Sequence, residues 1–402
     1  MSRFDSGTMR FASKCVRVKI DNPPQPSPRS AARPEPVPEP ERPVRPTEPR
    51  IGDPAWFERV RASLRGHTAQ FVASRCAEEL APLGFAEPIR ALGGVIGGGK
   101  ALRPTFMYLG WLCGADESEA ALRASASLEL LHAFALVQDD VMDESDSRRG
   151  RPAAHVRMAR WHARGGHTGS SARFGESAAV LLGDLCLVWA ERMLRESGID
   201  AAAAARVWPH YDAMRAELAI GQLADLLNDA AHFPSLERVL DIARRKSGNY
   251  TVRRPLELGA AMAGCPAPVL EALGDFGGLI GEAFQIRDDL LGLFGDPAIT
   301  GKPAGADLRD RKATTVVVLA GQLATPAARA RLHQFLARPE LDDHAVADAL
   351  TLIDKSGAPR RAEQMIAERL LRAESVLDRS GVDPVAAEAL VRLARRSTDR
   401  SH

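Results

Sequence analysis

The chain has 402 residues, a formal net charge of +1 at pH 7 and only 5% aromatic residues. This balance gives no electrostatic case for nucleic acid as a partner, because nucleic-acid-binding domains carry a marked excess of positive charge. Ala, Leu and Arg dominate the composition, and strand-like runs of alternating Val, Ile and Thr do not occur between turn signals. We therefore expect an all-α protein. The length allows two or three average domains, or one large helical fold around a cavity.

The N-terminal segment differs from the rest of the chain. Between residues 23 and 49, proline alternates with Glu, Arg and Ser, a composition that cannot bury a core. We predict that residues 1–50 form a disordered proline-rich tail and that residues 51–402 form a single all-helical domain. The tail is either a ligand for a proline-recognising partner or a dispensable extension, and Met9 is a possible alternative start.

Cysteine usage and hydropathy predict the compartment. The five cysteines are widely spaced and form no CxxC pair, which indicates reduced thiols. The N-terminus has two arginines but no apolar segment of a secretory signal. The longest apolar runs, such as residues 314–321, are far shorter than the roughly 18 residues of a membrane span. We expect a cytoplasmic protein without stable membrane insertion.

The first elements predicted after the tail are a helix and an anion-binding loop. Apolar residues at helical spacing predict a helix over residues 56–83. A glycine-rich loop at residues 92–99 then leads to Lys100 and Arg103, just before the next helix. Backbone amides at a helix N-terminus attract anions, and the two cations would add full charges.

The prediction of a functional site starts from the stretch at residues 128–152. Its apolar residues recur at spacings of three, four and seven and predict a buried helix, whose last turns carry Asp139, Asp140 and Asp143. Carboxylates three and four residues apart lie about 6 Å from one another, and a helix C-terminus disfavours negative charge. A bound cation would offset this. Carboxylates without Cys or paired His suit Mg²⁺.

Several helical segments follow in the middle of the chain. A Gly/Ser-rich segment at residues 165–175 predicts a surface loop, and helical patterns continue over residues 177–193 and 211–227. Lys246 and Ser247 then lie in a stretch compatible with helix. The last part, residues 319–400, is typical of amphipathic helices.

A second acidic site repeats the pattern of the first. The apolar run at residues 276–284 leads to Asp288 and Asp289, shortly before Gly295 ends the helix. Basic residues trail both sites: Arg148 and Arg149 after the first, Lys302 and Lys312 after the second. Two carboxylate clusters that face one cavity would hold magnesium ions on a diphosphate. The ions would stabilise its negative charge and so promote its departure as a leaving group.

Five stretches, taken together, resemble the motifs of the trans-isoprenyl diphosphate synthases, or polyprenyl synthetases. They are DDVMD with RRGRP, GGGKALRP, the Lys-Ser pair at 246–247, FQIRDDLLG, and GKPAGADLRDRK. The likeness runs from about residue 92 to the C-terminus. It implies a large antiparallel helical bundle around a central apolar cavity, a homodimer to which the helix at 56–83 contributes, and about three Mg²⁺ ions per active site.

The resemblance also implies a role for each site residue. The metal ligands are Asp139, Asp140, Asp143, Asp288 and Asp289. The ligands of isopentenyl diphosphate are Lys100, Arg103, His132 and Arg149. The residues around the allylic diphosphate are Arg148, Gln222, Asp225, Lys246, Ser247, Gln285, Lys302 and Lys312. Of these, Arg148, Lys246 and Lys302 are the catalytic cations that stabilise the departing diphosphate.

Two positions depart from the family pattern. Ala101 stands where the family usually has a second basic residue, so we expect weaker binding of isopentenyl diphosphate. Gly292 stands at the last position of the second motif, where the family has an aspartate, and Asp296 is a candidate replacement acting through a water.

The implied reaction is head-to-tail condensation of isopentenyl diphosphate onto an allylic diphosphate, which is dimethylallyl, geranyl or farnesyl diphosphate. Phe134 and Ala135, one turn before the first motif, resemble the cavity floor of the synthases that stop at C20. Geranylgeranyl diphosphate is therefore the expected product, with farnesyl diphosphate second and longer polyprenyl diphosphates third. The alternative is that Phe134 only packs between helices and the floor lies elsewhere.

Two other functions stay open. A class I terpene cyclase would share the fold and the first motif, but NDAAHFPSLE at residues 228–237 misses the spacing of the cyclase motif. A non-catalytic subunit of a heteromeric synthase would explain Ala101 and Gly292, although the retained aspartates argue against it.

Overall fold

The computed structural model describes residues 49–96, 98–228, 234–296, 304–338 and 340–399. The chain divides into two units, Met1–Glu48 and Pro49–His402, and all described residues belong to the second. The predicted tail at residues 1–50 therefore lies almost wholly outside the described residues, and so does Lys302.

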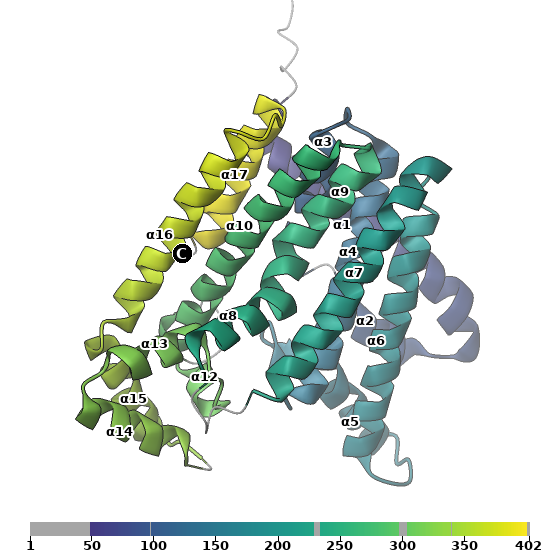
Figure 1. The fold of residues 1–402 in the computed structure, drawn as a ribbon. Coiled ribbons are helices and arrows are strands. Elements are labelled where there is room, and N and C mark those ends of the chain that lie inside the picture. Colours follow the sequence, from purple (N-terminus) through teal and green to yellow (C-terminus); the bar gives the residue numbers. More distant parts are fainter. Residues whose placement is uncertain (1–48, 97, 229–233, 297–303, 339, 400–402) are drawn as a thin grey trace, which may run out of the picture. The chain divides into compact units, whose positions relative to one another are not determined.

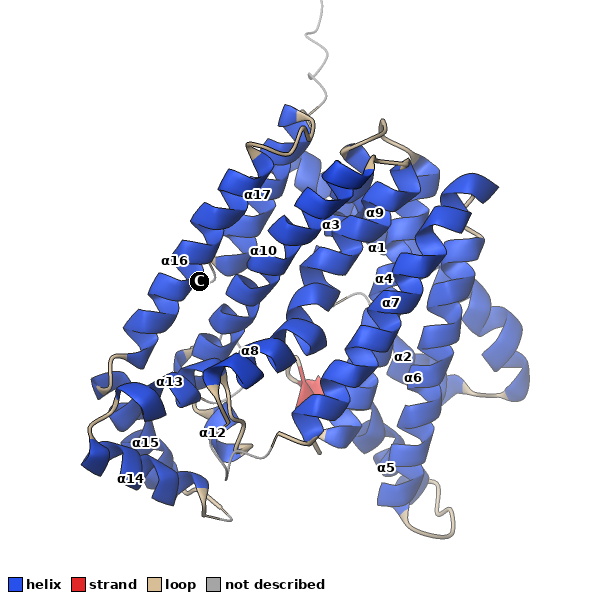
Figure 2. Cartoon of the chain, viewed as in Figure 1, coloured by secondary structure: helices blue, strands red, loops and turns tan. Residues whose placement is uncertain are grey.

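The described body is built almost entirely from helices, which confirms the all-α prediction (Figures 1 and 2). The first half contains α1 (Pro54–Arg75), η1 (Cys76–Leu80), η2 (Ala81–Leu83), α2 (Ala86–Val95), α3 (Leu102–Leu112), α4 (Glu119–Met142), the strands β1 (Ser147–Arg148) and β2 (Arg151–Pro152), α5 (Ala154–Arg164), α6 (Ser171–Arg195) and α7 (Ala201–Leu226). The second half contains α8 (Leu236–Ala243), η4 (Arg244–Arg253), α9 (Arg254–Ala263), α10 (Ala267–Phe294), α12 (Ala306–Arg309), α13 (Thr315–Leu323), α14 (Pro326–Leu336), α15 (Asp343–Lys355), α16 (Ala358–Leu377) and α17 (Pro384–Thr398).

Side-chain caps define where several helices begin. Asp200 caps α7 by accepting a hydrogen bond from the backbone N–H of Ala203 at 2.8 Å. Ser170 caps α6 in the same way, so α6 begins at Ser171. The predicted loop at residues 165–175 was therefore too long, because a serine that reads as loop composition serves here as a helix cap.

Helix α4 lies at the centre of the larger hydrophobic core. It packs against α1, α3 and α6, and its face carries buried Leu128, Leu130 and Leu131. Among the described residues, α4 is the one helix long and apolar enough to cross a membrane by length and composition. That is weak support for a span, because 67% of its most apolar window is buried in the body and core helices pass the same test.

The π-helix η4 is held tightly between α7 and α10. A Cβ on Gly221 of α7 would lie 2.5 Å from the backbone nitrogen of Lys246, and a Cβ on Gly248 would lie 2.9 Å from the carbonyl carbon of Gly281 in α10. Glycines thus allow backbone contact at both crossings. This packing brings Lys246 toward the end of α7 and toward the second acidic motif.

A second, smaller core supports the C-terminal end of α10. Leu290 and Leu293 of α10 pack with Leu308 of α12 and with buried residues of α13–α16. The segment after the second motif is therefore anchored against the helix that carries the motif.

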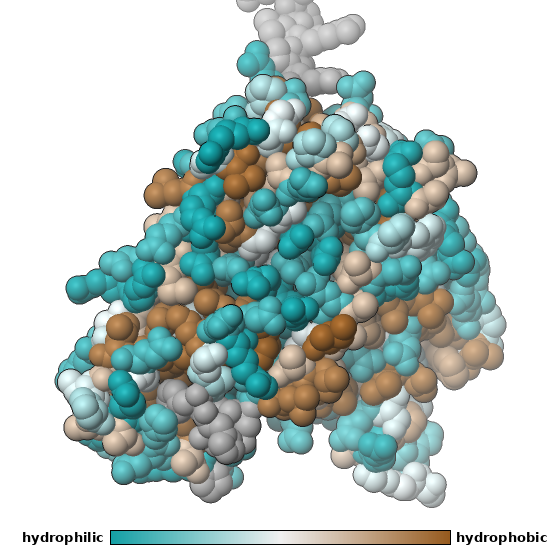
Figure 3. All heavy atoms as spheres, viewed as in Figure 1, coloured by the Kyte–Doolittle hydropathy of each residue, from teal (hydrophilic) through white to brown (hydrophobic). Residues whose placement is uncertain are grey.

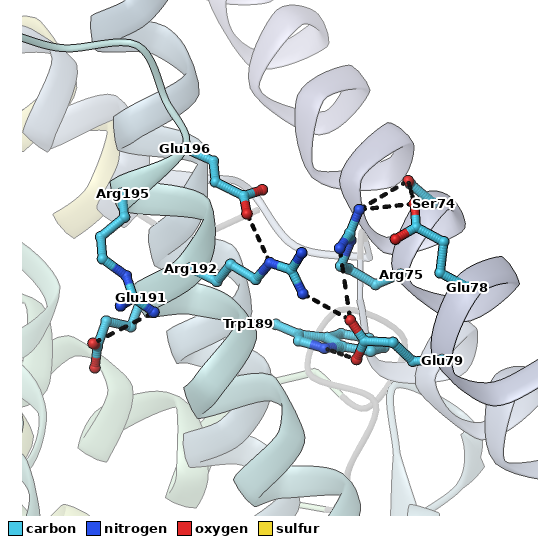
Figure 4. Close-up of polar contacts among 9 residues, drawn as sticks. All are labelled: Ser74, Arg75, Glu78, Glu79, Trp189, Glu191, Arg192, Arg195 and Glu196. Carbon is cyan, nitrogen blue, oxygen red and sulfur yellow. Dashed lines mark hydrogen bonds and ion pairs between the residues drawn. The ribbon is translucent and has the colours of Figure 1, made fainter.

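A buried tryptophan joins η1 to α6 (Figure 4). The indole N–H of Trp189, a side chain only 1% exposed, donates to Glu79 at 3.0 Å. The same carboxylate accepts from Arg192 at 2.9 Å and pairs with Arg75 at 3.6 Å. These two ion pairs, which are partly exposed, satisfy the carboxylate that accepts from the buried indole.

Candidate active site

A tight hairpin folds Arg148 back over the end of α4. Strands β1 and β2 pair through Arg148 and Arg151, and the turn between them holds Arg149 at φ 53° and Gly150 at φ 71°. Positive φ is unfavourable for arginine and marks a locally constrained site. The hairpin places Arg148 Nε 2.8 Å from Asp140 Oδ1, while Arg148 Nη2 lies 3.5 Å from Asp139 Oδ2.

Two lysines from distant segments pair with the acids of the first motif. Lys246 Nζ lies 2.6 Å from Asp225 Oδ2 and 3.2 Å from Asp139 Oδ1. Lys312 Nζ lies 2.6 Å from Asp143 Oδ2, across 169 residues of sequence. The first motif is therefore neutralised by cations that come from η4 and from the loop before α13.

The second motif lies in the last turns of α10. Asp289 is only 6% exposed, and it accepts hydrogen bonds from Gln285 Nε2 and from the backbone N–H of Thr315, both at 2.9 Å. Thr315 is the first residue of α13, so the carboxylate faces the positive end of that helix. Burial nevertheless raises the pKa of Asp289 to about 7, against the lowering effect of these hydrogen bonds.

Both motifs line one cavity of about 360 Å³. The first motif contributes Asp139 and Asp143, and the second contributes Asp288 and Asp289. Other predicted residues on its wall are Arg148, Asp225, Lys246, Ser247, Gln285 and Lys312. Apolar Leu136, Val239 and Ile242 complete part of the lining. The structure thus brings together most of the residues predicted around an allylic diphosphate.

The charges in the cavity keep the central groups ionised. Burial alone would raise the pKa of Asp139, but Lys246, Lys312 and Arg148 outweigh it and the pKa is lowered. Burial alone would lower the pKa of Lys246, but the charges of Asp139 and Asp225 raise it. The pKa of Lys312 is raised against burial in the same way, mainly by Asp143. The cavity therefore holds full positive and negative charges shielded from solvent.

Three of the predicted isopentenyl diphosphate residues, Arg103, His132 and Arg149, gather near His132, two turns before Asp139 on α4. Arg103 Nη2 donates to Thr251 Oγ1 at 2.9 Å, and its guanidinium carbon lies 4.4 Å from the centre of the Tyr250 ring. His132 lies beside the same ring, with 6.3 Å between the ring centres. Burial, together with the charges of Arg103 and two further arginines, holds the pKa of His132 well below its usual range, so the ring is neutral.

The predicted glycine-rich loop at residues 92–99 is shorter than expected, because α2 runs through Gly93 and Gly94 to Val95, and Gly98 lies against this group. A Cβ on Gly98 would lie 2.7 Å from Arg149 Nη1, and Lys100 is exposed in the same loop. His132 Nδ1 is buried and has no hydrogen-bond partner among the described residues. Buried polar atoms without partners are uncommon in native proteins, so a bound ligand is a natural complement for this ring.

The carboxylates fit a hard divalent cation, but only with help from a ligand. Their oxygens suit Mg²⁺, and no thiolate or paired imidazole lines the cavity in the described residues. Within the described ranges, no three acids or imidazoles stand close enough to hold an ion by themselves. Magnesium commonly binds through one or two carboxylates and completes its shell with waters and phosphate oxygens. The arrangement therefore suits ions that arrive with a diphosphate.

Besides the residues predicted for isopentenyl diphosphate, four further predicted residues lie away from the cavity wall. Asp140 is 3% exposed and lines a neighbouring arginine-rich cavity of about 450 Å³, where Arg148 holds it. Gln222 Nε2 lies 3.9 Å from Met142 Sδ. Phe134 and Ala135 are half-buried and pack against the larger core. Their predicted roles as metal ligand, diphosphate neighbour and cavity floor remain predictions.

Asp307 also lines the cavity, although the sequence reasoning did not single it out. It belongs to the basic stretch at residues 301–312, after the second motif. An acid within that stretch could have been recognised from the sequence, but the stretch was interpreted only for its lysines. Tyr250 and Thr251, which hold Arg103, were missed because nothing in the local sequence indicates contact with a residue on α3. By contrast, Asp296 is exposed and does not line the cavity, which makes it a poor replacement for the aspartate missing at Gly292.

The fold and the cavity define a class: an all-helical protein with two sets of carboxylates and several cations arranged for a diphosphate. The sequence profile of the polyprenyl synthetase family matches residues 89–353. The chain therefore belongs to the polyprenyl synthetase family.

Individual relatives agree with this assignment. The chain is 32% identical to a short chain isoprenyl diphosphate synthase of Methanocaldococcus jannaschii over 260 residues, which cover 64% of this chain and 73% of that protein. It is 34% identical to a geranylgeranyl diphosphate synthase of Mycobacterium tuberculosis over 281 residues, covering 69% and 75% of the two chains. Among solved structures, the geranylgeranyl pyrophosphate synthase of Corynebacterium glutamicum, complexed with isoprenyl diphosphate and magnesium, superposes with a TM-score of 0.80. It is 36% identical, and the match covers 86% of this chain and 99% of that one.

Family membership makes the protein a prenyltransferase, but it does not select a product. Similar relatives also carry the names farnesyl, geranylfarnesyl and nonaprenyl diphosphate synthase. Product length therefore has to be argued from the residues of this chain.

Proposed function

We propose that the protein condenses isopentenyl diphosphate onto an allylic diphosphate with the help of about three Mg²⁺ ions, and that its product is geranylgeranyl diphosphate. The observation that carries the proposal is the single cavity lined by Asp139 and Asp143 on one side and by Asp288 and Asp289 on the other. The magnesium and isoprenyl diphosphate in the Corynebacterium glutamicum structure support the choice of metal and ligand.

The chain's own residues would organise the ionisation of the allylic diphosphate. Bound Mg²⁺ would supply Lewis-acid stabilisation of the diphosphate charge. Arg148, Lys246 and Lys312 stand around the same cavity and are held charged by the acids, so they can stabilise the negative charge that develops as the carbon–oxygen bond breaks. Lys246 Nζ lies 3.2 Å from Asp139 Oδ1 and Lys312 Nζ lies 2.6 Å from Asp143 Oδ2, so both ammonium groups stand beside carboxylates of the first motif.

The second substrate would sit between Arg103, His132, Arg149 and the glycine-rich loop. Its alkene attacks the allylic cation to form the new carbon–carbon bond, and a proton is then lost from the adjacent carbon. The departing diphosphate is the proposed acceptor, because a neutral His132 buried among arginines is a poor base. Lys302 is proposed as a further cation on the diphosphate by family resemblance alone, because it lies outside the described residues.

Chain length is proposed from Phe134. This half-buried aromatic residue packs against the larger core about one turn before the first motif, at the position that resembles the cavity floor of the synthases that stop at C20. The relatives with geranylgeranyl names are compatible with this length. Farnesyl diphosphate remains the second candidate.

The assay uses the purified chain with Mg²⁺, isopentenyl diphosphate and each of the three allylic diphosphates, followed by mass spectrometry of the products. Condensation without a second protein supports the proposal, and its loss on chelation of divalent ions supports the metal requirement. Cyclised hydrocarbon from a single substrate would instead identify a terpene cyclase. Inactivity that is relieved only by a partner protein would identify a subunit of a heteromeric synthase.

A homodimer and a cytoplasmic location are part of the proposal. Apolar side chains gather over the C-terminal end of α7 (Figure 3), and Leu181 and Val188 on α6 are 68% and 58% exposed. Exposed apolar patches of this kind often mark interfaces, and a second copy is the partner proposed here. The four described cysteines are all free thiols, which agrees with a reducing compartment. Light scattering after size exclusion would measure the oligomeric state.

A further inference from the structure

The second acidic motif lacks its last aspartate, and the structure offers another carboxylate in the same place. Gly292 lies four residues after Asp288 and three after Asp289, so all three positions share one side of α10. A side chain at residue 292 would therefore project from the helix beside the two existing acids.

That space is occupied by Asp307. A Cβ built on Gly292 would overlap Oδ2 of Asp307 and would lie 2.6 Å from its Cγ. The overlap means that the Asp307 carboxylate fills the volume where an aspartate at residue 292 would begin. The absence of a side chain at residue 292 thus leaves room for the carboxylate of Asp307, which a larger residue would have to displace.

The carboxylate is held there by the backbone and by packing. The N–H of Gly305 donates to the carbonyl of Leu293 at 3.0 Å, which fixes the start of α12 against the end of α10. Leu308, the residue after Asp307, is fully buried in the smaller core together with Leu293. The backbone carbonyl of Asp307 also accepts from the N–H of Lys312 at 2.8 Å. Asp307 is therefore placed by the same turn that places Lys312.

Asp307 is also part of the charge arrangement of the cavity. It lines the cavity with Asp288, Asp289 and Lys312. A third negative group at this wall is the arrangement expected if positive charge is to be bound there.

We infer that Asp307 replaces the missing aspartate of the second motif and serves, with Asp288 and Asp289, as the carboxylate wall that holds a divalent cation on the diphosphate. The inference rests on the proposed function, because the cation and the diphosphate belong to it. It assigns a metal-binding role to a residue outside the DDxxD pattern. It also implies that Gly292 and Asp307 depend on each other, because the glycine leaves the space that the carboxylate fills.

The test measures ligand binding rather than turnover. Inorganic pyrophosphate is titrated calorimetrically into the full chain in the presence of Mg²⁺, and circular dichroism confirms that each variant is folded. We expect Asp307→Asn to weaken binding by about 10- to 100-fold, the usual cost of losing a group that supports a bound metal. The matched control is Asp310→Asn, an exposed acid just after α12 that does not line the cavity, and its binding should equal that of the wild type.

Relocating the carboxylate distinguishes a metal-binding role from a packing role. The double variant Asp307→Ala with Gly292→Asp returns a carboxylate to the family position and should recover most of the lost affinity. Gly292→Ala alone should weaken binding, because its Cβ displaces the acid, yet it should have no further effect in the Asp307→Ala background. Binding that survives Asp307→Asn, or a folded double variant that recovers nothing, would overturn the inference. Failure of the wild type to bind magnesium pyrophosphate would instead refute the proposed function.

Discussion

Lys246→Gln is expected to reduce kcat by about three orders of magnitude while leaving the protein folded. The ammonium lies between Asp139 and Asp225, and its side chain is only 20% exposed. A cation about 4 Å from the departing diphosphate at an effective dielectric constant near 20 is worth about 4 kcal/mol. This energy corresponds to about 10³ in rate, provided that the contact strengthens as the carbon–oxygen bond breaks.

Glutamine removes the positive charge but keeps an N–H donor, on a side chain only one atom shorter than that of lysine, so the loss reports mainly the charge. The matched control is Arg245→Gln, which removes a cation from the adjacent residue, where the side chain is 44% exposed and pairs with Asp241 at 2.9 Å. Its kcat should change little, because exposed ion pairs contribute little. Steady-state incorporation of labelled isopentenyl diphosphate, with saturating Mg²⁺, measures both variants. A Lys246→Gln enzyme within tenfold of the wild type, or an equal loss in Arg245→Gln, would refute the electrostatic reasoning.

The remaining predictions concern product length, substrate affinity and pH. Phe134→Ala should shift the products toward longer chains in mass spectra, and an unchanged distribution would place the floor elsewhere. Arg103→Gln should raise the KM for isopentenyl diphosphate by about 10- to 100-fold, the value of a charge-assisted hydrogen bond, with the KM of the allylic substrate unaltered. Asp289 has a pKa raised to about 7 by burial, so its contribution to stability is fully present below the ordinary carboxyl pKa and is lost as pH rises through about 7. The melting temperature of the metal-free protein should therefore fall as the pH rises from about 4, the ordinary carboxyl pKa, to about 7. Asp289→Asn should reduce this dependence of the melting temperature on pH.

Local sequence signals predicted the helices well. Gly295 correctly marked the end of α10, which terminates at Phe294, and Asp139 and Asp140 lie in the last turn of α4 as expected. The error at residues 165–175 arose because a capping serine and a loop serine look alike in sequence. The π-helical turns of η4 gave no sequence signal, since the close crossings at Gly221 and Gly248 that accompany them involve other helices.

The acidic motifs of the candidate site could be predicted from the sequence, but the contacts between distant residues could not. Each acidic motif could be found because its acids cluster within about one turn at the end of an apolar helix, and the order of the motifs indicated the family. The partners of these acids could not be found in this way: Lys312 reaches Asp143 across 169 residues, and Arg103 is held by Thr251 across 148. No local pattern specifies which side chains meet over such separations.

The amino-acid order alone therefore determined that helices form, where they end and which of them carry clustered carboxylates, because these features depend on interactions within one or two turns. The tertiary structure decided that both clusters share one cavity, that Lys246 and Lys312 neutralise the first of them, and that Asp307 stands where Gly292 leaves room. These outcomes depend on how helices pack across the core, and in particular on the glycine crossings and the buried leucines that set the distances between them.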